Sequence, residues 1–154
     1  MPKIDIGALT EVSSSTYPEP FRSRVAGRFR KALGDAGGLT QFGVRLTRLT
    51  PGTQSSVRHW HASEDEFVYV LEGTLTLITD AGRQSLSAGE CAAFPAGVPD
   101  AHHLVNESGR DALYLEIGTR ASADLVTYPD DDLMVRRSAK DAAYTHKSGA
   151  PYEL

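Results

Sequence analysis

The sequence predicts an all-β fold, either a closed barrel or a jelly roll of short strands. From residue 40 onward, runs rich in Val, Leu, Tyr, Phe and Thr alternate with turns that contain Gly, Pro or Asp, which is typical of strands joined by tight reversals. The 154-residue chain also holds 14 glycines and 8 prolines, many turn-forming residues for one domain. Many short strands must protect their edges, and both architectures do so.

The alternation predicts eight strands, which are residues 40–49, 57–61, 66–71, 74–79, 83–86, 91–95, 102–106 and 112–119. The turns around them carry glycines at positions 52, 73, 82, 89, 97 and 109, where a tight reversal or a positive φ is expected. We therefore expect residues 40–119 to form the barrel, with residues 1–39 as an N-terminal arm packed on it. Residues 120–154 form a C-terminal extension, and the whole chain is one domain.

The N-terminal segment leaves two structures open. Phe21, Val25 and Phe29 recur at helical spacing, whereas residues 28–33 can equally form a strand that reverses at the glycine-rich run 34–38. Five basic side chains lie here: Arg22, Arg24, Arg28, Arg30 and Lys31. They suggest a site for a polyanion, but a solvated face or rim of the fold is the interpretation that we prefer.

The strand pattern is expected to end near Thr119, followed by an acidic run and a polar tail. Tyr144, Pro151 and Tyr152 are unusual in a tail that is merely disordered. We expect this tail to act as a clasp on the barrel or on a second subunit. Among the strand residues, Phe67, Tyr69, Leu77 and Phe94 are candidates for the core or for the walls of a pocket, with the core preferred.

Composition disfavours several classes of function. The net charge of −4 offers no positive field for nucleic acid or anionic lipid, and no run of about 18 apolar residues could span a membrane. The first residues lack the apolar core of a signal peptide, so we expect a cytoplasmic protein. The single cysteine, Cys91, cannot form an intrachain disulfide, and we expect it to be a small buried residue.

The residues that carry chemistry begin at His59-Trp60-His61. Alternate residues of a strand face the same side, so His59 and His61 project together. Five residues after His61, Glu66 opens the next expected strand and can bring a carboxylate to the same point. Two imidazoles and a carboxylate suit a borderline divalent transition metal. A fourth ligand must come from the remaining histidines, which are His102, His103 and His146.

These residues resemble the paired motifs of the cupin superfamily, Gly-x5-His-x-His-x(3,4)-Glu-x6-Gly and Gly-x5-Pro-x-Gly-x2-His-x3-Asn. The first motif matches at Gly52, His59, His61, Glu66 and Gly73, with one extra residue before His59. The second matches at Gly89, Pro95, Gly97, His102 and Asn106, with four residues instead of two before His102. The His-x3-Asn spacing selects His102 over His103, and Asn106 is expected to be a structural hydrogen-bonding residue.

Nearly the whole chain is similar to a group of small single-domain cupins of unassigned activity. The resemblance implies a double-stranded β-helix (jelly-roll) barrel, commonly a homodimer, with a metal bound by His59, His61, Glu66 and His102. Ligand type does not choose among Fe, Mn, Ni or Zn, nor does it exclude Co or Cu.

Two functions follow from such a site. One is a metal-dependent enzyme for a small molecule, of dioxygenase, isomerase or lyase type, with catalytic residues beyond the ligands unknown. The other is a non-catalytic module that binds or senses a small molecule. The residues before the barrel are too few for a helix-turn-helix DNA-binding domain, so a fused transcription factor is disfavoured.

Overall fold

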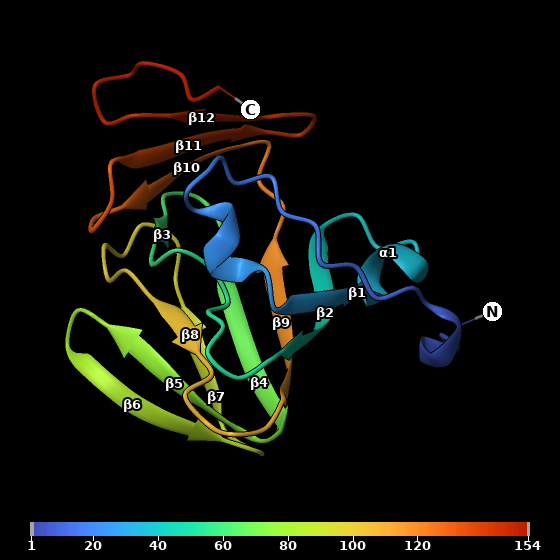
Figure 1. Ribbon diagram of the computed structural model, residues 1–154. Coiled ribbons are helices and arrows are strands. Elements are labelled where there is room, and N and C mark those ends of the chain that lie inside the picture. Colours follow the sequence, from blue (N-terminus) through green and yellow to red (C-terminus); the bar gives the residue numbers. More distant parts are fainter. Residues whose placement is uncertain (1, 154) are drawn as a thin grey trace.

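The computed structural model describes residues 2–153 and consists of three antiparallel sheets with very little helix (Figure 1). The five-stranded sheet has the order β1-β2-β9-β4-β7, with β1 Arg28–Ala32, β2 Phe42–Leu49, β9 Ala112–Thr119, β4 Glu66–Glu72 and β7 Cys91–Phe94. The three-stranded sheet is β6-β5-β8, with β6 Gly82–Ser87, β5 Thr74–Thr79 and β8 His103–Val105. The expected all-β jelly-roll barrel is confirmed.

A third sheet of four strands caps the barrel at its open end (Figure 1). Its order is β12-β11-β10-β3, with β12 Ala142–Thr145, β11 Leu133–Ser138, β10 Ala123–Tyr128 and β3 Trp60–His61. The expectation that the strand pattern ends near Thr119 is therefore wrong. The alternation is present in β10, where Asp124, Val126 and Tyr128 are all buried, but a polar residue among the buried positions obscured it.

The open question in the N-terminal segment is settled in favour of a strand. Residues 28–32 form β1, and a one-turn helix, α1 (Leu33–Ala36), follows it. Two short 3-10 helices precede them, η1 (Ile6–Ala8) and η2 (Arg22–Val25). No helix in residues 2–153 is both long and apolar enough to cross a membrane.

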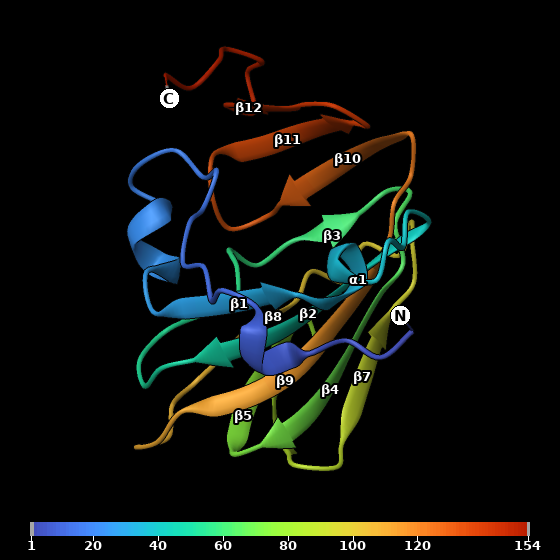
Figure 2. The same cartoon turned by 90° about the vertical axis from the view of Figure 1, so that its right-hand side faces the viewer.

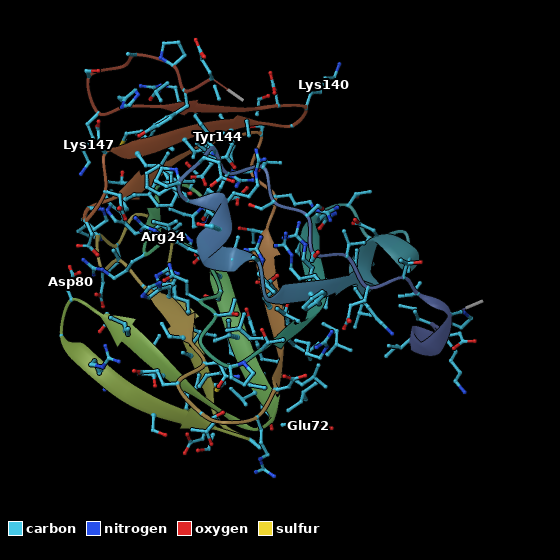
Figure 3. The ribbon with its side chains drawn as sticks, viewed as in Figure 1. Arg24, Glu72, Asp80, Lys140, Tyr144 and Lys147 are labelled. Carbon is cyan, nitrogen blue, oxygen red and sulfur yellow. The ribbon has the colours of Figure 1, made fainter. Side chains whose placement is uncertain are left out.

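Two apolar clusters hold the fold together. The first fills the barrel between the five-stranded and three-stranded sheets, and its members include Leu49, Val70, Leu75, Leu104 and Tyr114. The second joins the four-stranded sheet to the N-terminal segment, and its members include Tyr17, Phe21, Val126, Leu133 and Tyr144. Each such side chain contributes about 1.5–3 kcal/mol when it is fully buried. The N-terminal and C-terminal segments are thus packed against each other, as Figure 3 shows around Tyr144.

Register decides which side chains of the five-stranded sheet face the barrel interior. Residues paired directly across antiparallel strands share a face, and Leu49 pairs with Ala112, both 0% exposed. This is the inner face. Tyr69 pairs with Cys91 on the opposite face, where Tyr69 is 38% exposed and Cys91 is also exposed. Both residues were expected inside and lie outside, because the sequence did not show which face of β4 and β7 the barrel covers.

Asn106 confirms its expected structural role. It is fully buried, and its Nδ2 donates to the Leu49 carbonyl oxygen at 2.7 Å and to the Arg110 carbonyl oxygen at 2.8 Å. Its Oδ1 accepts a hydrogen bond from the Ser108 amide at 3.0 Å. The side chain therefore ties the loop after β8 to the end of β2, beside the three-stranded sheet.

Candidate metal centre

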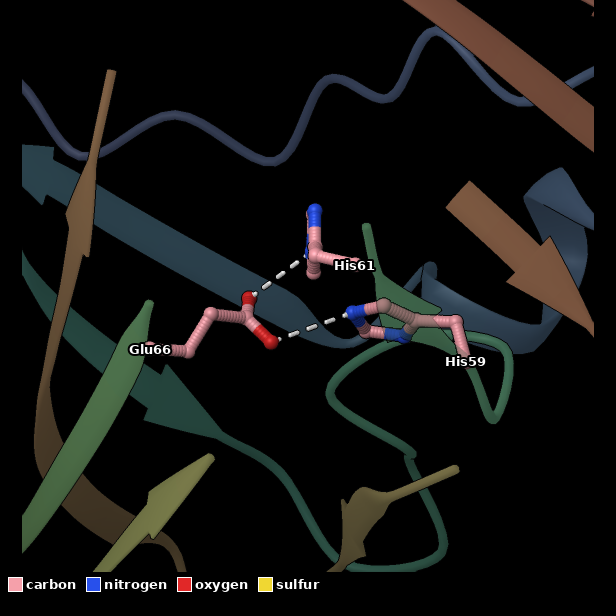
Figure 4. A group of neighbouring side chains, drawn as sticks. All are labelled: His59, His61 and Glu66. Atoms are coloured by element: carbon pink, nitrogen blue, oxygen red, sulfur yellow. Dashed lines mark ion pairs between the residues drawn. The ribbon is translucent and has the colours of Figure 1, made fainter. Parts of the chain in front are cut away.

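Three of the proposed ligands lie at the open end of the barrel, brought together by two neighbouring segments. His61 lies in β3, His59 immediately precedes it, and Glu66 begins β4. Figure 4 shows each imidazole directed at a different oxygen of the Glu66 carboxylate. The His61 Nε2 lies 3.2 Å from Glu66 Oε1, and the His59 Nε2 lies 3.4 Å from Oε2.

The fourth proposed ligand joins them through a backbone bridge. His102 pairs with His59 across an isolated antiparallel bridge, in which the His102 amide donates to the His59 carbonyl oxygen at 2.9 Å. Its Nε2 lies 2.6 Å from Glu66 Oε2, and its ring stacks on Phe94 at 3.6 Å between centroids. All four residues predicted as ligands therefore lie around the Glu66 carboxylate, and His59, His61 and Glu66 offer ligand atoms that lie within 4.8 Å of one another. Their assignment as ligands stays a prediction.

The other two histidines lie apart from this cluster. His103 is the first residue of β8, and its Nδ1 lies 2.9 Å from the Ser56 carbonyl oxygen. His146 lies in the C-terminal segment, where its Nδ1 is 2.8 Å from Asp132 Oδ2 and its ring stacks on Tyr152. His102, and not His103, lies at the Glu66 carboxylate, and the preference for His102 as the ligand stays a prediction.

Hydrogen bonds at Nδ1 decide which nitrogen of each proposed ligand carries the proton. Each Nδ1 faces an oxygen that can only accept: the Val57 carbonyl oxygen for His59 at 2.8 Å, Asp124 Oδ2 for His61 at 2.5 Å, and the Asp100 carbonyl oxygen for His102 at 3.3 Å. The Ser56 hydroxyl, which can accept or donate, also lies 3.2 Å from the His59 Nδ1. Nδ1 is therefore the protonated nitrogen of each neutral ring. In the neutral form of each ring the Nε2 lone pair then faces a carboxylate, an arrangement that a bound cation would stabilise.

The spacing of these atoms fits one metal ion. Two ligand atoms that each lie about 2.1 Å from an ion, at a right angle, are about 3.0 Å apart. The three contacts between histidine Nε2 atoms and the Glu66 oxygens span 2.6–3.4 Å. Three imidazole nitrogens and one carboxylate oxygen also form a donor set that suits a divalent transition metal. The residues present therefore fit the implied ion.

The electrostatics of the cluster follow from burial and proximity. Burial lowers the pKa of His59. Burial also opposes protonation of His61, but Glu66 and Asp124 outweigh it and raise the pKa of His61 to about 9. Burial raises the pKa of Glu66, yet the three facing imidazoles hold it well below its ordinary value. The cluster is therefore built around an ionised carboxylate.

Asp124 is the residue of this site that the sequence did not reveal. Its side chain is completely inaccessible, and besides His61 it accepts a hydrogen bond from the Ser63 amide at 2.8 Å. A carboxylate behind a metal-binding histidine fixes the ring and its tautomer and strengthens the ligand. The contact between Asp124 and His61 depends on the pairing of β10 with β3. This pairing joins residues about 60 positions apart, so no local pattern in the sequence indicates it.

The cluster opens into a cavity of about 700 Å³ inside the barrel. Phe94 and Tyr128 line it beside the histidines, and Gly43 and Gly118 line it beside Glu66. Gly118 pairs with Gly43 on one side and with Glu66 on the other, so two neighbouring positions of the wall carry no side chain. Because these positions carry no side chain, the Arg120 guanidinium lies close over Gly43 and the Glu66 side chain lies close over Gly118.

Known proteins resemble the chain in both sequence and structure. The family model for the cupin domain matches residues 45–118. A crystal structure from Silicibacter pomeroyi, named as a sugar phosphate isomerase from a cupin superfamily, is 44% identical with a TM-score of 0.95, and the match covers 99% of this chain and 98% of that one. No curated protein matches the sequence.

Two further solved structures are less similar. A crystal structure from Acidithiobacillus ferrooxidans, named with a proposed assignment as a sugar phosphate isomerase, is 30% identical to this chain with a TM-score of 0.75. The match covers 84% of this chain and 83% of that one. The polyketide cyclase RemF from Streptomyces resistomycificus is 21% identical with a TM-score of 0.62, over 77% of this chain and 79% of that one. The likeness to the cyclase shows a shared fold alone.

Proposed function

This chain belongs to the cupin superfamily, and from that premise we propose that it is a metal-dependent enzyme that isomerises a small sugar-like molecule. One observation carries the proposal: three histidine Nε2 atoms converge on Glu66, while each Nδ1 is engaged by a group that can only accept. Isomerisation is the reaction that we prefer because the 44% identical relative is named as a sugar phosphate isomerase.

The metal would be held by His59, His61, Glu66 and His102, with Fe, Mn, Ni or Zn as candidates. When bound there, it supplies Lewis-acid polarisation of a substrate carbonyl or hydroxyl oxygen. Four protein ligands leave positions of an octahedral ion open for that oxygen.

The protein's own groups prepare the site for this chemistry. Asp124 holds the His61 ring in one orientation and keeps its Nδ1 protonated. Phe94 packs flat on His102, and the Tyr128 ring lies 5.7 Å from the His59 ring, so two ligands are also fixed by aromatic contacts. These walls exclude water from one side of the cluster and position a substrate on the cavity side.

Separate reconstitution with each candidate metal tests the proposal, with NMR detection of aldose–ketose interconversion in a panel of sugar phosphates. We expect turnover by the parent and its loss, together with the metal, in Glu66→Gln. Asp65→Asn is the matched control, because the Asp65 Oδ1 accepts from the Ala96 amide outside the cluster. A fully metal-loaded parent that binds panel members without converting any of them would make the non-catalytic binding module the better description.

We also propose that the chain forms a homodimer through the outer face of the five-stranded sheet. Leu46, Leu115 and Tyr69 form one row across three strands of this face, and Leu71 is 40% exposed beside them. Figure 2 looks onto the barrel from this side, where the N-terminal segment also projects. A two-fold axis can bring such an apolar face onto its copy. Tyr69→Arg should turn a dimer into a monomer in analytical ultracentrifugation, and a dimer of unchanged stability would exclude this face.

The cytoplasmic location stays a prediction. Fractionation of cells that express the untagged chain tests it, and recovery of the protein outside the cytoplasm would contradict it.

A further inference from the structure

Three arginines line the same cavity as the metal cluster, on the inner face of the five-stranded sheet. Arg28 and Arg30 lie in β1, and Arg45 lies in β2. Arg30 pairs with Thr47 and Arg28 pairs with Leu49, so both point to the side on which Leu49 is buried. The interpretation of this basic run as a solvated rim is wrong for Arg28, which is only 6% exposed.

The hydrogen bonds of Arg28 are incomplete. Its Nη1 donates to the Ser55 carbonyl oxygen at 2.6 Å, but its Nε has no acceptor among residues 2–153. A guanidinium stays charged even when it is buried, and a buried donor without a partner is costly. The Tyr114 hydroxyl, in the same cavity, likewise has no partner among the described residues.

Negative charge near these arginines is scarce. Glu116 Oε1 lies 3.5 Å from Arg30 Nη1 and 3.9 Å from Arg45 Nη1, both longer than the about 2.7–2.9 Å of a strong charged hydrogen bond. One carboxylate is thus shared loosely by two guanidiniums, and no salt bridge reaches Arg28 within the described chain. Burial and the neighbouring Arg30 both lower the pKa of Arg28. Glu116 opposes this effect but only partly offsets it.

Two arginines outside the cavity behave differently. Arg24, on η2 (Figure 3), makes a two-pronged contact with Asp131 at 2.9 and 3.0 Å. Arg58 makes the same kind of contact with Asp130 at 2.6 and 2.8 Å. Arg24 and Arg58 are thus fully paired, whereas Arg28 keeps a free donor and Arg30 and Arg45 share one carboxylate, which favours the cavity group as a place for an external anion.

The register also sets the separation of this group from the metal cluster. Arg45 pairs with Glu116 on β9, and Glu66 pairs with Gly118, two residues further along β9. Two strand spacings and two residues of rise put the Cα atoms of Arg45 and Glu66 about 12 Å apart. Both side chains reach inward, so the gap between the guanidinium and the carboxylate suits a short-chain molecule with an anionic end.

We propose that Arg28, Arg30 and Arg45 form a subsite for the phosphate group of a phosphomonoester whose other end lies at the metal cluster. This rests on the proposed function and names its substrate class. The planar guanidinium fork matches two phosphate oxygens, and the Tyr114 hydroxyl adds a donor. A phosphomonoester carries a charge of about −1.5 to −2 and three acceptor oxygens, which suits three cations better than a carboxylate does.

The test is calorimetric titration of the full chain with inorganic phosphate, before and after removal of metal by a chelator. Arg45→Gln and Arg30→Gln should each weaken phosphate binding at least tenfold in both forms. Arg24→Gln is the matched control and should leave it within twofold. Acetate should bind at least tenfold more weakly than phosphate. Elemental analysis of the metal-loaded variants shows that the metal cluster is intact.

The outcomes separate this subsite from the proposed reaction. Phosphate binding that depends on Arg30 and Arg45 supports the subsite, even when no sugar phosphate is converted. Phosphate binding that is unchanged in both variants, or acetate binding as tight as phosphate binding, overturns it, even when the parent is an isomerase. Because the measurement is repeated without metal, phosphate bound to the metal ion itself cannot be mistaken for binding to the arginines.

Discussion

Asp124→Asn probes the part of the metal centre that the sequence concealed. The Asp124 Oδ1 accepts from the Ser63 amide at 2.8 Å, and its Oδ2 accepts from His61 Nδ1 at 2.5 Å. An asparagine that keeps its oxygen on Ser63 turns its NH2 group towards His61. Donor then faces donor, so His61 is driven to the tautomer with a proton on Nε2, the atom that should bind the metal.

We expect this substitution to weaken metal binding by about 10–100-fold, which is about 1.4–2.7 kcal/mol. Competition with a chromophoric chelator at fixed pH measures the affinity. Asp132→Asn is the matched control, because Asp132 accepts from His146 Nδ1 at 2.8 Å in the C-terminal segment. The control should stay within twofold of the parent. An Asp124→Asn protein that folds and binds metal within twofold of the parent would refute the role of this carboxylate.

Two further predictions concern pH and the C-terminal segment. Since Glu66 and Asp124 outweigh burial and raise the pKa of His61 to about 9, protons compete with the metal below that pH. Apparent metal affinity should rise from pH 6 to pH 9, and a flat profile would contradict this. Deletion of residues 141–154 removes Tyr144, which is 4% exposed, and should cost about 3–5 kcal/mol, lowering Tm by at least about 6 °C. An unchanged Tm in scanning calorimetry would show that this packing is unimportant.

The sequence predicts well whatever depends on local alternation. His59 and His61 lie on one side because they are two residues apart in extended chain, and Glu66 follows after a loop of suitable length. The same reasoning predicts the eight strands of the barrel region, although the run expected over residues 57–61 is a strand only at Trp60–His61.

Pairing between distant strands accounts for what the sequence does not show. Asp124 reaches His61 only because β10 pairs with β3. Cys91 lies in a strand, as expected, but the register turns it outward with Tyr69. Arg28 and Arg30 point inward while Phe29 lies outside under Arg48, with the guanidinium 4.4 Å from the ring centroid. In β1 the charged side chains therefore face the interior and the aromatic side chain faces outward, which is the reverse of the usual pattern. The reason is that the interior at this point is a polar cavity.

The most direct test of the metal centre is elemental analysis of the parent protein purified without added metal or a metal-binding tag, with His102→Ala and His103→Ala in parallel. The account predicts near-stoichiometric transition metal in the parent and in His103→Ala, and its loss in His102→Ala. Iron would then direct screening to oxygen-dependent reactions, and zinc, nickel or manganese to isomerisation. A parent that holds no metal even after reconstitution, or a His102→Ala protein that keeps it fully, would contradict the four-ligand site.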